Sequence, residues 1–458
     1  MASLVKRCWP TGFSLRRISA LSRNFADRKL CPKMTMSTCV DSSLSPWLML
    51  PPLIEDGGDM IYKFYNLSED KEESFRRNSE EEMAEDDAQL VGSSHGWLAL
   101  FNQRNNNHLF LYNPITGRHI KLPPIETLHE PRYNFTRDGH GSVSKLILSS
   151  SPDEDECIAM MTFGQGDRLA FCHPCRSTEW TPIGKLFFHA SDLKHYNGLI
   201  FYQMEYGRAY EDFVYCARLK RFTCITQVEI DLFRRCLKFP ISELEDWDFS
   251  DPHSPVLTHF PHKDLRTFGF EGDGEWINQN LSLLDKCLQI PYLVFSEEHD
   301  HHFIVIRFVM DRVAPNGSYA HIEEIPFDPI SQGFLVDAYP YKTIGFCVLK
   351  VSNPQKDGWR MVREVRLVKD SDSLDGLTMF IGMNHSFAVS SADFPNLKPN
   401  SIYFTDANKH DNSFYGGHDI GIFDYANKTF SDCYYPCVDI PSLRKIAPSP
   451  MWFTPSLY

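Results

Sequence analysis

Short apolar runs alternate with clusters of turn residues along most of the chain, beginning at Ser45. In the first such group, three runs each have the length and composition of one strand: Ser94–Phe101, His108–Asn113 and His119–Pro123. The polar residues Asn105–Asn107 and Thr116-Gly117 stand between these runs, where turns belong. This spacing predicts a small antiparallel sheet.

Groups of the same kind follow along the rest of the chain. Their runs are Lys145–Ser149, Cys157–Phe163, Asp167–His173, Trp180–Ile183, Gly198–Met204, Phe213–Leu219, Phe222–Val228, Tyr292–Phe295, Phe303–Met310, Ile344–Val351, Trp359–Val365, Met379–Val389, Ser401–Thr405 and Gly421–Tyr425. One hairpin pattern recurs in LYNPITGRHIKL, VYCARLKRFTCI and IFDYANKTFSDC, and more loosely in AFCHPCRSTEWTPI. Sheet-sized units at intervals of roughly 40 to 60 residues are typical of propeller blades. We therefore predict an all-β fold, a β-propeller of degenerate kelch-like blades, with the number of blades left open.

Two segments interrupt the pattern. Glu69–Asp87 carries ten acids against three basic residues and is predicted to be a solvated surface loop. Asp231–Ile290 lacks strand alternation and is predicted to be a partly helical insertion. Near its end, one helical stripe of apolar residues is formed by Ile277, Leu281, Leu284 and Leu288. We expect this helix to pack on the side or top of the ring.

The first 25 residues have the composition of a targeting segment. They contain no acid and several serines, and their basic residues are Lys6, Arg7, Arg16, Arg17 and Arg23. An Arg-rich, acid-poor start that can form an amphipathic helix is typical of mitochondrial or chloroplast transit peptides. The arginines and the scarcity of alanine favour the mitochondrion, and Arg23 lies three residues before a plausible cleavage site at Ala26. An untargeted basic tail is the alternative. We thus divide the chain into a mitochondrial transit peptide (1–25), a polar linker (26–44) and the propeller (45–458).

Composition limits the function. The formal net charge of −14 argues against a nucleic-acid surface, because phosphate contacts need clustered Lys and Arg. No run of 18 apolar residues occurs, so no membrane insertion is expected. The 13 cysteines are odd in number and irregularly spaced, which favours free thiols in a reducing interior over a disulfide scaffold.

Three motifs are candidates for a catalytic or metal-binding site. Gly92-Ser93-Ser94-His95-Gly96 matches the G-x-S-x-G elbow of hydrolases. The elbow needs a helix after its serine, whereas the β-like GWLALF follows here, so a turn opening a blade strand is favoured. The C-x-x-C pair Cys172 and Cys175 could join Cys433 and Cys437 around zinc. Their separation favours ordinary thiols on a hairpin turn.

The third motif is a histidine-rich stretch, His299 to His302, whose composition suits a transition metal. It also stands between two apolar strands, where a hairpin tip belongs, and that interpretation is favoured. No phosphate loop, zinc-protease helix or dinucleotide turn occurs. We therefore predict no catalytic, cofactor-binding or metal-binding residue, and no enzyme activity.

The chain resembles the plant KIB-type β-propeller proteins, a family also described as F-box/kelch-like. The likeness is carried by SPWLMLP from Ser45, by GWL from Gly96 running on to LYNPITGRHIKLPPI, by PYLV from Pro291, and by the stretch from Trp359 through MFIGMNHSFAVSSADFPNLKPNSIYFTDAN to GIFD at Gly421. The closing PMWFTPS from Pro450 is also similar. Within these stretches, FPNLKPNSIYFTD is the most specific. The resemblance implies a propeller from Ser45 to the C-terminus.

Many members of that family begin with an F-box, a helical module that docks a ubiquitin-ligase scaffold. Only 44 residues precede the likeness here, and no Leu-Pro-x-[DE]-Leu start occurs among them. The chain is therefore similar to an organellar subgroup without the F-box. We predict a non-enzymatic protein-interaction module of mitochondria, with plastids as a further possible location. The alternative is a substrate-recognition adaptor of a cytosolic or nuclear ubiquitin ligase. The loops around the first blade and residues 231–290 are the predicted binding face.

Overall fold

The computed structural model describes residues 45–54, 59–77, 88–102, 108–128, 143–164, 168–184, 194–196, 199–201, 209–227, 243–260, 275–284, 286–310, 312–314, 317–320, 327–328, 333–334, 341–357, 360–369, 373–406, 417–433 and 449–455. All of them belong to one compact unit, Ser42–Tyr458. The predicted transit peptide and linker lie outside the described residues.

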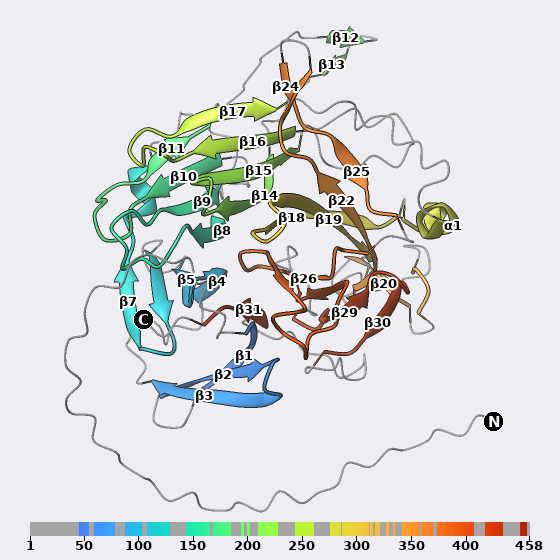
Figure 1. Ribbon diagram of the computed structural model, residues 1–458, viewed down its shortest axis with the longest axis horizontal. Coiled ribbons are helices and arrows are strands. Elements are labelled where there is room, and N and C mark those ends of the chain that lie inside the picture. The colour runs from blue at the N-terminus through green and yellow to red at the C-terminus, as the bar shows by residue number, and fades with distance from the viewer. Residues whose placement is uncertain are drawn as a thin grey trace, which may run out of the picture. The chain divides into compact units, whose positions relative to one another are not determined.

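Three sheets are four-stranded antiparallel meanders, each from one continuous stretch of chain (Figure 1). Blade 2 contains β4 (Ala88–Ser94), β5 (Trp97–Asn102), β6 (His108–Asn113) and β7 (Arg118–Lys121). Blade 3 contains β8 (Val143–Leu148), β9 (Ala159–Phe163), β10 (Arg168–Cys172) and β11 (Thr181–Ile183). Blade 4 contains β14 (Ala209–Cys216), β15 (Arg221–Gln227), β16 (Glu243–Asp248) and β17 (Val256–Phe260).

A nine-stranded sheet combines two further blades, which share a single parallel bridge between Phe295 and Phe387. Blade 5 contains β18 (Leu288–Ser296), β19 (His301–Met310), β22 (Lys342–Val351) and β25 (Val365–Leu367). Blade 6 contains β26 (Leu377–Ile381), β27 (Phe387–Ser390), β28 (Ser401–Phe404), β29 (Gly421–Asp424) and β30 (Thr429–Ser431). In blade 6, β28 pairs with β26 in parallel, so this blade departs from the simple meander.

Blade 1 is built from both ends of the compact unit. It contains β1 (Trp47–Ile54), β2 (Met60–Asn66) and β3 (Lys71–Arg77), and the C-terminal β31 (Met451–Phe453) pairs antiparallel with β1. The Trp452 Nε1 atom of β31 also donates to the Ile381 carbonyl of blade 6, at 3.2 Å. The last strand therefore joins the first blade to the sixth and closes the ring.

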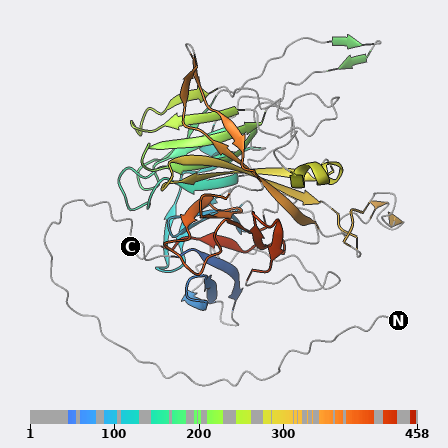
Figure 2. The ribbon, with the colours of Figure 1, turned by 45° about the vertical axis from the view of Figure 1, so that its right-hand side comes forward.

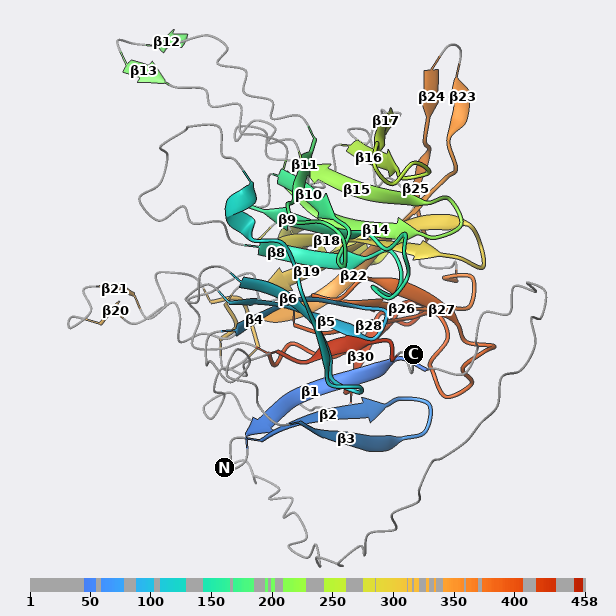
Figure 3. The ribbon, with the colours of Figure 1, turned by 90° about the vertical axis from the view of Figure 1, so that its left-hand side faces the viewer.

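The core lies between the blades. Each of the six hydrophobic clusters in the described part of the chain fills one interface between neighbouring blades. Between blades 6 and 1, for example, Leu48 packs with Phe380 and Trp452. Figure 1 shows the blades in chain order around the ring, and Figures 2 and 3 show the same blades from two further directions. Because each blade buries its faces only against its neighbours, the ring must be complete for any blade to be stable.

The predicted strands are largely found, and the all-β propeller is confirmed, with six blades among the described residues. All four predicted hairpins occur, joining β6 to β7, β10 to β11, β14 to β15, and β29 to β30. Two predicted strands lie wholly or mostly outside the blades. Trp359–Val365 is mainly β24 (Arg360–Val362), which pairs only with β23 (Gln355–Asp357), and Gly198–Met204 is the other. Its described part is β13 (Leu199–Phe201), which pairs only with β12 (Lys194–Tyr196).

The prediction for 231–290 was wrong in one respect, because this stretch contains β16 and β17 of blade 4. The β16 sequence ELEDWD does not show the alternation expected of a strand, because the acidic residues Glu245 and Asp246 are buried. Glu245 accepts a hydrogen bond from the Tyr210 hydroxyl at 3.1 Å, and Asp246 accepts one from the Thr223 hydroxyl at 2.8 Å. Tertiary partners therefore allow acids where the alternation rule expects apolar residues.

The predicted helix is found as α1 (Glu275–Leu284). Ile277 and Leu284 are buried against blade 5, and the Trp276 ring lies 6.3 Å from that of Phe308. Leu288 does not belong to this helix: it begins β18 and is 39% exposed. The helical stripe ended earlier than its apolar spacing predicted, because the chain turns at Lys286 into the strand.

The acidic segment is only partly a loop. Lys71–Arg77 forms β3, the outer strand of blade 1, and none of its residues is buried. A charged edge strand resists pairing with other chains. Residues 78–87 lie outside the described residues.

The remaining elements are small. They are the 3-10 helix at Ile125–Thr127 and the hairpins β20–β21 (Phe327–Asp328 and Gly333–Phe334) and β23–β24 (Gln355–Asp357 and Arg360–Val362). No helix among the described residues has the length and apolar character needed to cross a membrane.

Candidate functional site

Polar side chains from four blades, 2, 3, 4 and 6, meet where the inner strands converge. We call this set the hub cluster: Ser93, Ser94, His95, Lys145, Asp212, Asn384, His385 and Ser386. The segment before β27 reaches blade 2, because the His385 amide donates to the Ser93 carbonyl at 2.9 Å. It also reaches blade 4, where the Tyr215 amide donates to His385 Nε2 at 3.4 Å. The hub cluster is thus held by backbone contacts between blades distant in sequence.

The G-x-S-x-G motif lies in the hub cluster but is built for structure. A Cβ atom on Gly92 would stand 1.9 Å from the Leu146 carbonyl oxygen, so only glycine lets β4 approach β8 this closely. The Ser94 hydroxyl is buried and accepts the Leu148 amide at 2.9 Å. His95 and Gly96 both have positive φ and form the turn into β5. No helix follows, which agrees with the favoured interpretation of a turn opening a blade strand.

An ion pair joins blades 3 and 4 within the hub cluster. Lys145 of β8 pairs with Asp212 of β14, and both side chains are nearly buried. The second Asp212 oxygen accepts the Leu293 amide of blade 5 at 2.7 Å. The lysine charge is therefore neutralised, and one carboxylate fastens three blades.

Two histidine rings lie beside each other in the hub cluster. The centroids of the His95 and His385 rings are 6.3 Å apart. Burial lowers the pKa of His95 to about 4, although a hydrogen bond with the Leu148 backbone opposes this fall. Burial, with His95 and Lys145 nearby, lowers the pKa of His385 to about 3. Both rings are therefore neutral at pH 7.

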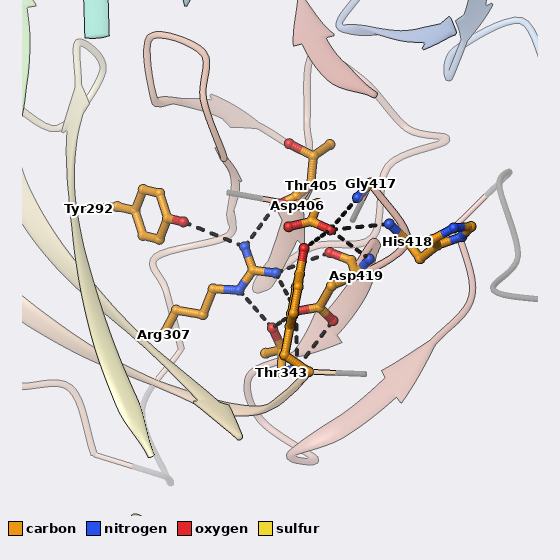
Figure 4. Close-up of polar contacts among 9 residues, drawn as sticks. Tyr292, Arg307, Thr343, Thr405, Asp406, Gly417, His418 and Asp419 are labelled. Atoms are coloured by element: carbon orange, nitrogen blue, oxygen red, sulfur yellow. Dashed lines mark hydrogen bonds and ion pairs between the residues drawn. The ribbon is translucent and has the colours of Figure 1, made fainter. Parts of the chain in front are cut away.

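A second polar set, the Arg307 cluster, joins blades 5 and 6 (Figure 4). The Arg307 guanidinium is buried and donates to the Thr343 hydroxyl (2.6 Å), the Thr405 carbonyl (2.7 Å) and the Asp419 carboxylate (2.7 Å). Asp419 also accepts the Thr343 hydroxyl at 2.6 Å. Burial opposes the charge of Arg307, yet Asp419, Tyr292 and Asp406 raise its pKa.

FPNLKPNSIYFTD, the sequence most specific to the family, ends in the Arg307 cluster. Asp406, the last residue of NSIYFTD, accepts the Gly417 amide and the Tyr341 hydroxyl, both at 2.6 Å. Asn400, the first, accepts the Gly376 amide at 3.0 Å and has a positive φ of 53°. Ile402 and Phe404 are buried between blades 5 and 6. The string therefore specifies how blade 6 is joined to its surroundings.

A third buried pair joins blades 4 and 5. Arg363 donates to Asp246 at 2.6 Å, and both side chains are almost fully buried. Burial raises the pKa of Asp246 and lowers that of Arg363, although each partner opposes the other's shift. Burial thus disfavours the charged form of both partners, and each charge is retained only beside the other.

The cysteines of the candidate zinc motif lie in different parts of the fold. Cys172 ends β10 and is buried, and Cys175 is exposed on the following turn with its thiol on the Pro152 carbonyl at 3.4 Å. Cys433 packs in a different cluster, between blades 6 and 1, and Cys437 lies outside the described residues.

The histidine-rich stretch forms the predicted hairpin tip between β18 and β19. The His299 ring lies 3.2 Å from the Ser296 hydroxyl, and His302 is buried against Phe295. Burial lowers the pKa of His302 well below its ordinary value. Within the residues that the structure describes, no group of three or more His, Cys, Asp or Glu side chains is placed to hold a metal ion.

The fold and these contacts can be compared with known proteins. The model of the KIB1-4 beta-propeller family matches residues 64–424, which is more than half of the chain. The chain belongs to this family. The KIB1-4 match begins in β2 and ends with β29. Blade 1 and the closing strand extend beyond it, and no curated protein matches the chain.

Solved structures with some likeness are distant. A dihydro-heme d1 dehydrogenase, NirN, has 10% identity and a TM-score of 0.30, and the match covers 90% of this chain and 64% of that one. A hydrazine synthase from Kuenenia stuttgartiensis has 12% identity and a TM-score of 0.26, covering 74% and 99%. A GH43 β-1,3-galactosidase has 8% identity and a TM-score of 0.26, covering 68% and 92%. The chain spans less than two thirds of the length of the first of these.

Proposed function

We propose that the chain is a non-enzymatic protein-interaction module that acts in mitochondria. The proposal of a non-enzymatic role rests on one observation: the G-x-S-x-G motif and the polar residues around it hold the blades together. Ser94 accepts a backbone amide, and Lys145 and Asp212 neutralise each other between blades. A propeller whose polar interior serves its own architecture offers its rigid surface for binding.

The turns that link the strands at one end of the ring form a firm surface for a partner. Ion pairs join these turns from blade to blade: Arg118 with Asp153 (2.6 Å), Lys220 with Glu156 (2.9 Å), and Arg218 with Asp300. Exposed pairs contribute little stability, but each one brings side chains of two neighbouring blades together at this end of the ring. The predicted binding face includes the β6–β7 turn of blade 2, the first blade predicted from the sequence, and, within residues 231–290, the turn at Asp251.

The mitochondrial part rests on the first 25 residues, with their five basic side chains and no acid. Import would separate the chain from cytosolic and nuclear ubiquitin ligases. The same basic start therefore disfavours the adaptor alternative.

Cross-linking of the full-length chain in isolated mitochondria tests the binding face. We expect cross-links to one protein to concentrate on the β6–β7 turn and on residues 251–255. Exposed Thr116→Arg with His253→Glu should remove them, whereas Thr429→Arg on the outer strand β30 should not. Cross-links that survive the first pair of substitutions would reject this face, and turnover of a small substrate would reject a non-enzymatic role.

A further inference from the structure

The hub cluster contains buried polar atoms that no protein atom satisfies. Such atoms also occur elsewhere among the described residues, but five of them lie on or beside two adjoining segments: Ser93 Oγ, His95 Nε2, Asn384 Oδ1 and Ser386 Oγ, with Thr405 Oγ1 nearby. The side chains of Ser93, Asn384 and Ser386 are more than nine-tenths buried. Folded proteins contain few such atoms, and each costs about 1–3 kcal/mol when nothing bonds to it. Their concentration on two adjoining segments therefore points to a bound group.

The contacts place these atoms around one region. The segments 93–95 and 384–386 are fastened together by the His385 amide on the Ser93 carbonyl. A Cβ atom on Gly382 would lie 2.1 Å from Thr405 Oγ1 and 3.1 Å from Asn384 Oδ1, so both oxygens face the Gly382 backbone. The four unsatisfied atoms are themselves shielded from bulk solvent, so only a small molecule can bond to them.

The hydrogen-bond donors and acceptors of the region determine which class of ligand it can bind. The neutral His95 ring bonds to the Leu148 backbone, and because Nε2 has no protein partner, that bond is made by Nδ1. Nε2 therefore presents a lone pair. Asn384 Oδ1 is a second acceptor, since its Nδ2 atom donates to the His385 carbonyl at 2.7 Å. Lys145 is already paired with Asp212. Two acceptors beside hydroxyl groups need a donor and repel an anion.

We propose that the hub cluster is a binding site for a small neutral molecule bearing hydroxyl groups, either water or a polyol. Its O–H groups donate to His95 Nε2 and Asn384 Oδ1, and its oxygens accept from the hydroxyls of Ser93 and Ser386. This site stands independently of the proposed protein-interaction role. It would give the ring a polar centre in place of an apolar one.

Crystallography of the full-length protein tests this, once without polyols and once with erythritol. We expect an ordered oxygen about 2.7–3.1 Å from His95 Nε2, held by water alone in the first crystal. Erythritol in the second crystal would identify a polyol site, and water in both would identify a water site. An empty region, or direct bonding of the Ser93 hydroxyl to His95, would overturn the proposal.

Solution binding separates this class of ligand from ions. Inorganic phosphate and Zn²⁺ are added to the wild-type protein and to a Ser93→Ala, Ser386→Ala variant, with exposed Ser254→Ala as the matched control. We expect neither ion to bind the hub, so the three proteins should give the same titrations. Binding of phosphate or Zn²⁺ that the double variant loses and Ser254→Ala keeps would overturn the neutral ligand class.

Discussion

The Arg307 cluster and the hub cluster are both buried, polar and shared between blades, yet their hydrogen bonding differs. In the Arg307 cluster each guanidinium nitrogen of Arg307 donates to an acceptor within the protein. In the hub cluster four polar atoms have none. Saturated networks rigidify a fold, and unsaturated ones are expensive unless something else bonds to them. The comparison distinguishes a structural joint from a candidate site.

The largest effect is expected at Arg307. Arg307→Met leaves the Asp419 carboxylate buried without its cation, and the loss should be about 3–5 kcal/mol in the free energy of unfolding. Urea unfolding of both proteins measures it. The double variant Arg307→Met, Asp419→Leu is the control, and it should recover part of the loss. A single variant as stable as the wild type would remove the distinction between the clusters.

The next effect tests the close approach of β4 to β8. Gly92→Ala places a methyl group against the Leu146 carbonyl oxygen, so the two strands must separate. Overpacking of this kind costs about 1–3 kcal/mol. The same unfolding measurement applies, with Ser93→Ala on the same strand as control. Equal stability of the two variants would contradict the account of Gly92 as a backbone requirement.

A smaller effect concerns pH and the two hub histidines. Their pKa values in the folded protein, about 4 for His95 and about 3 for His385, lie below the ordinary 6.5. Lowered values stabilise the fold fully above pH 6.5, and this contribution disappears as the pH falls through 4 towards 3. Unfolding measured from pH 8 to pH 3 should therefore show a steeper loss for the wild type than for His95→Asn.

Asparagine is chosen because it tolerates the positive φ of this position. Other groups titrate over the same range, so the difference between the two proteins is the quantity that matters. Parallel curves would mean that His95 already carries its proton in the folded state, and the neutral site would lose its main support.

The smallest effect is expected at the unsatisfied hydroxyls. Ser93→Ala removes a group with no protein partner, so the free energy of unfolding should change by less than about 1 kcal/mol in buffer without polyols. Ser94→Ala, by contrast, orphans the Leu148 amide and should cost more. If Ser93→Ala is the more damaging of the two, the hub is a joint like the Arg307 cluster.

Much of the fold could be predicted from the sequence because most blade strands follow the alternation rule. The hairpins and the apolar strands of blades 2, 3 and 5 are examples. Strand β16 could not be predicted, because its buried acids depend on partners distant in sequence, such as Arg363 for Asp246. The C-terminal β31 completes blade 1 through pairing with β1, a contact that no local pattern announces.

The site was harder to predict than the fold. The sequence drew attention to Ser94 as a nucleophile candidate, and the turn interpretation was the better one. It gave no sign of Arg307 or of Lys145 with Asp212, because such pairs depend on how blades meet. The string NSIYFTD was the one available signal. It marked family membership, and its ends prove to bond within blade 6 and to its neighbour.

Localisation of a C-terminally tagged full-length chain, with sequencing of its mature N-terminus, tests the central claim most directly. The account predicts a mitochondrial signal and a new N-terminus near Ala26. A diffuse cytosolic or nuclear signal with Met1 or Ala2 retained would contradict it, and the ubiquitin-ligase adaptor would then become the leading interpretation.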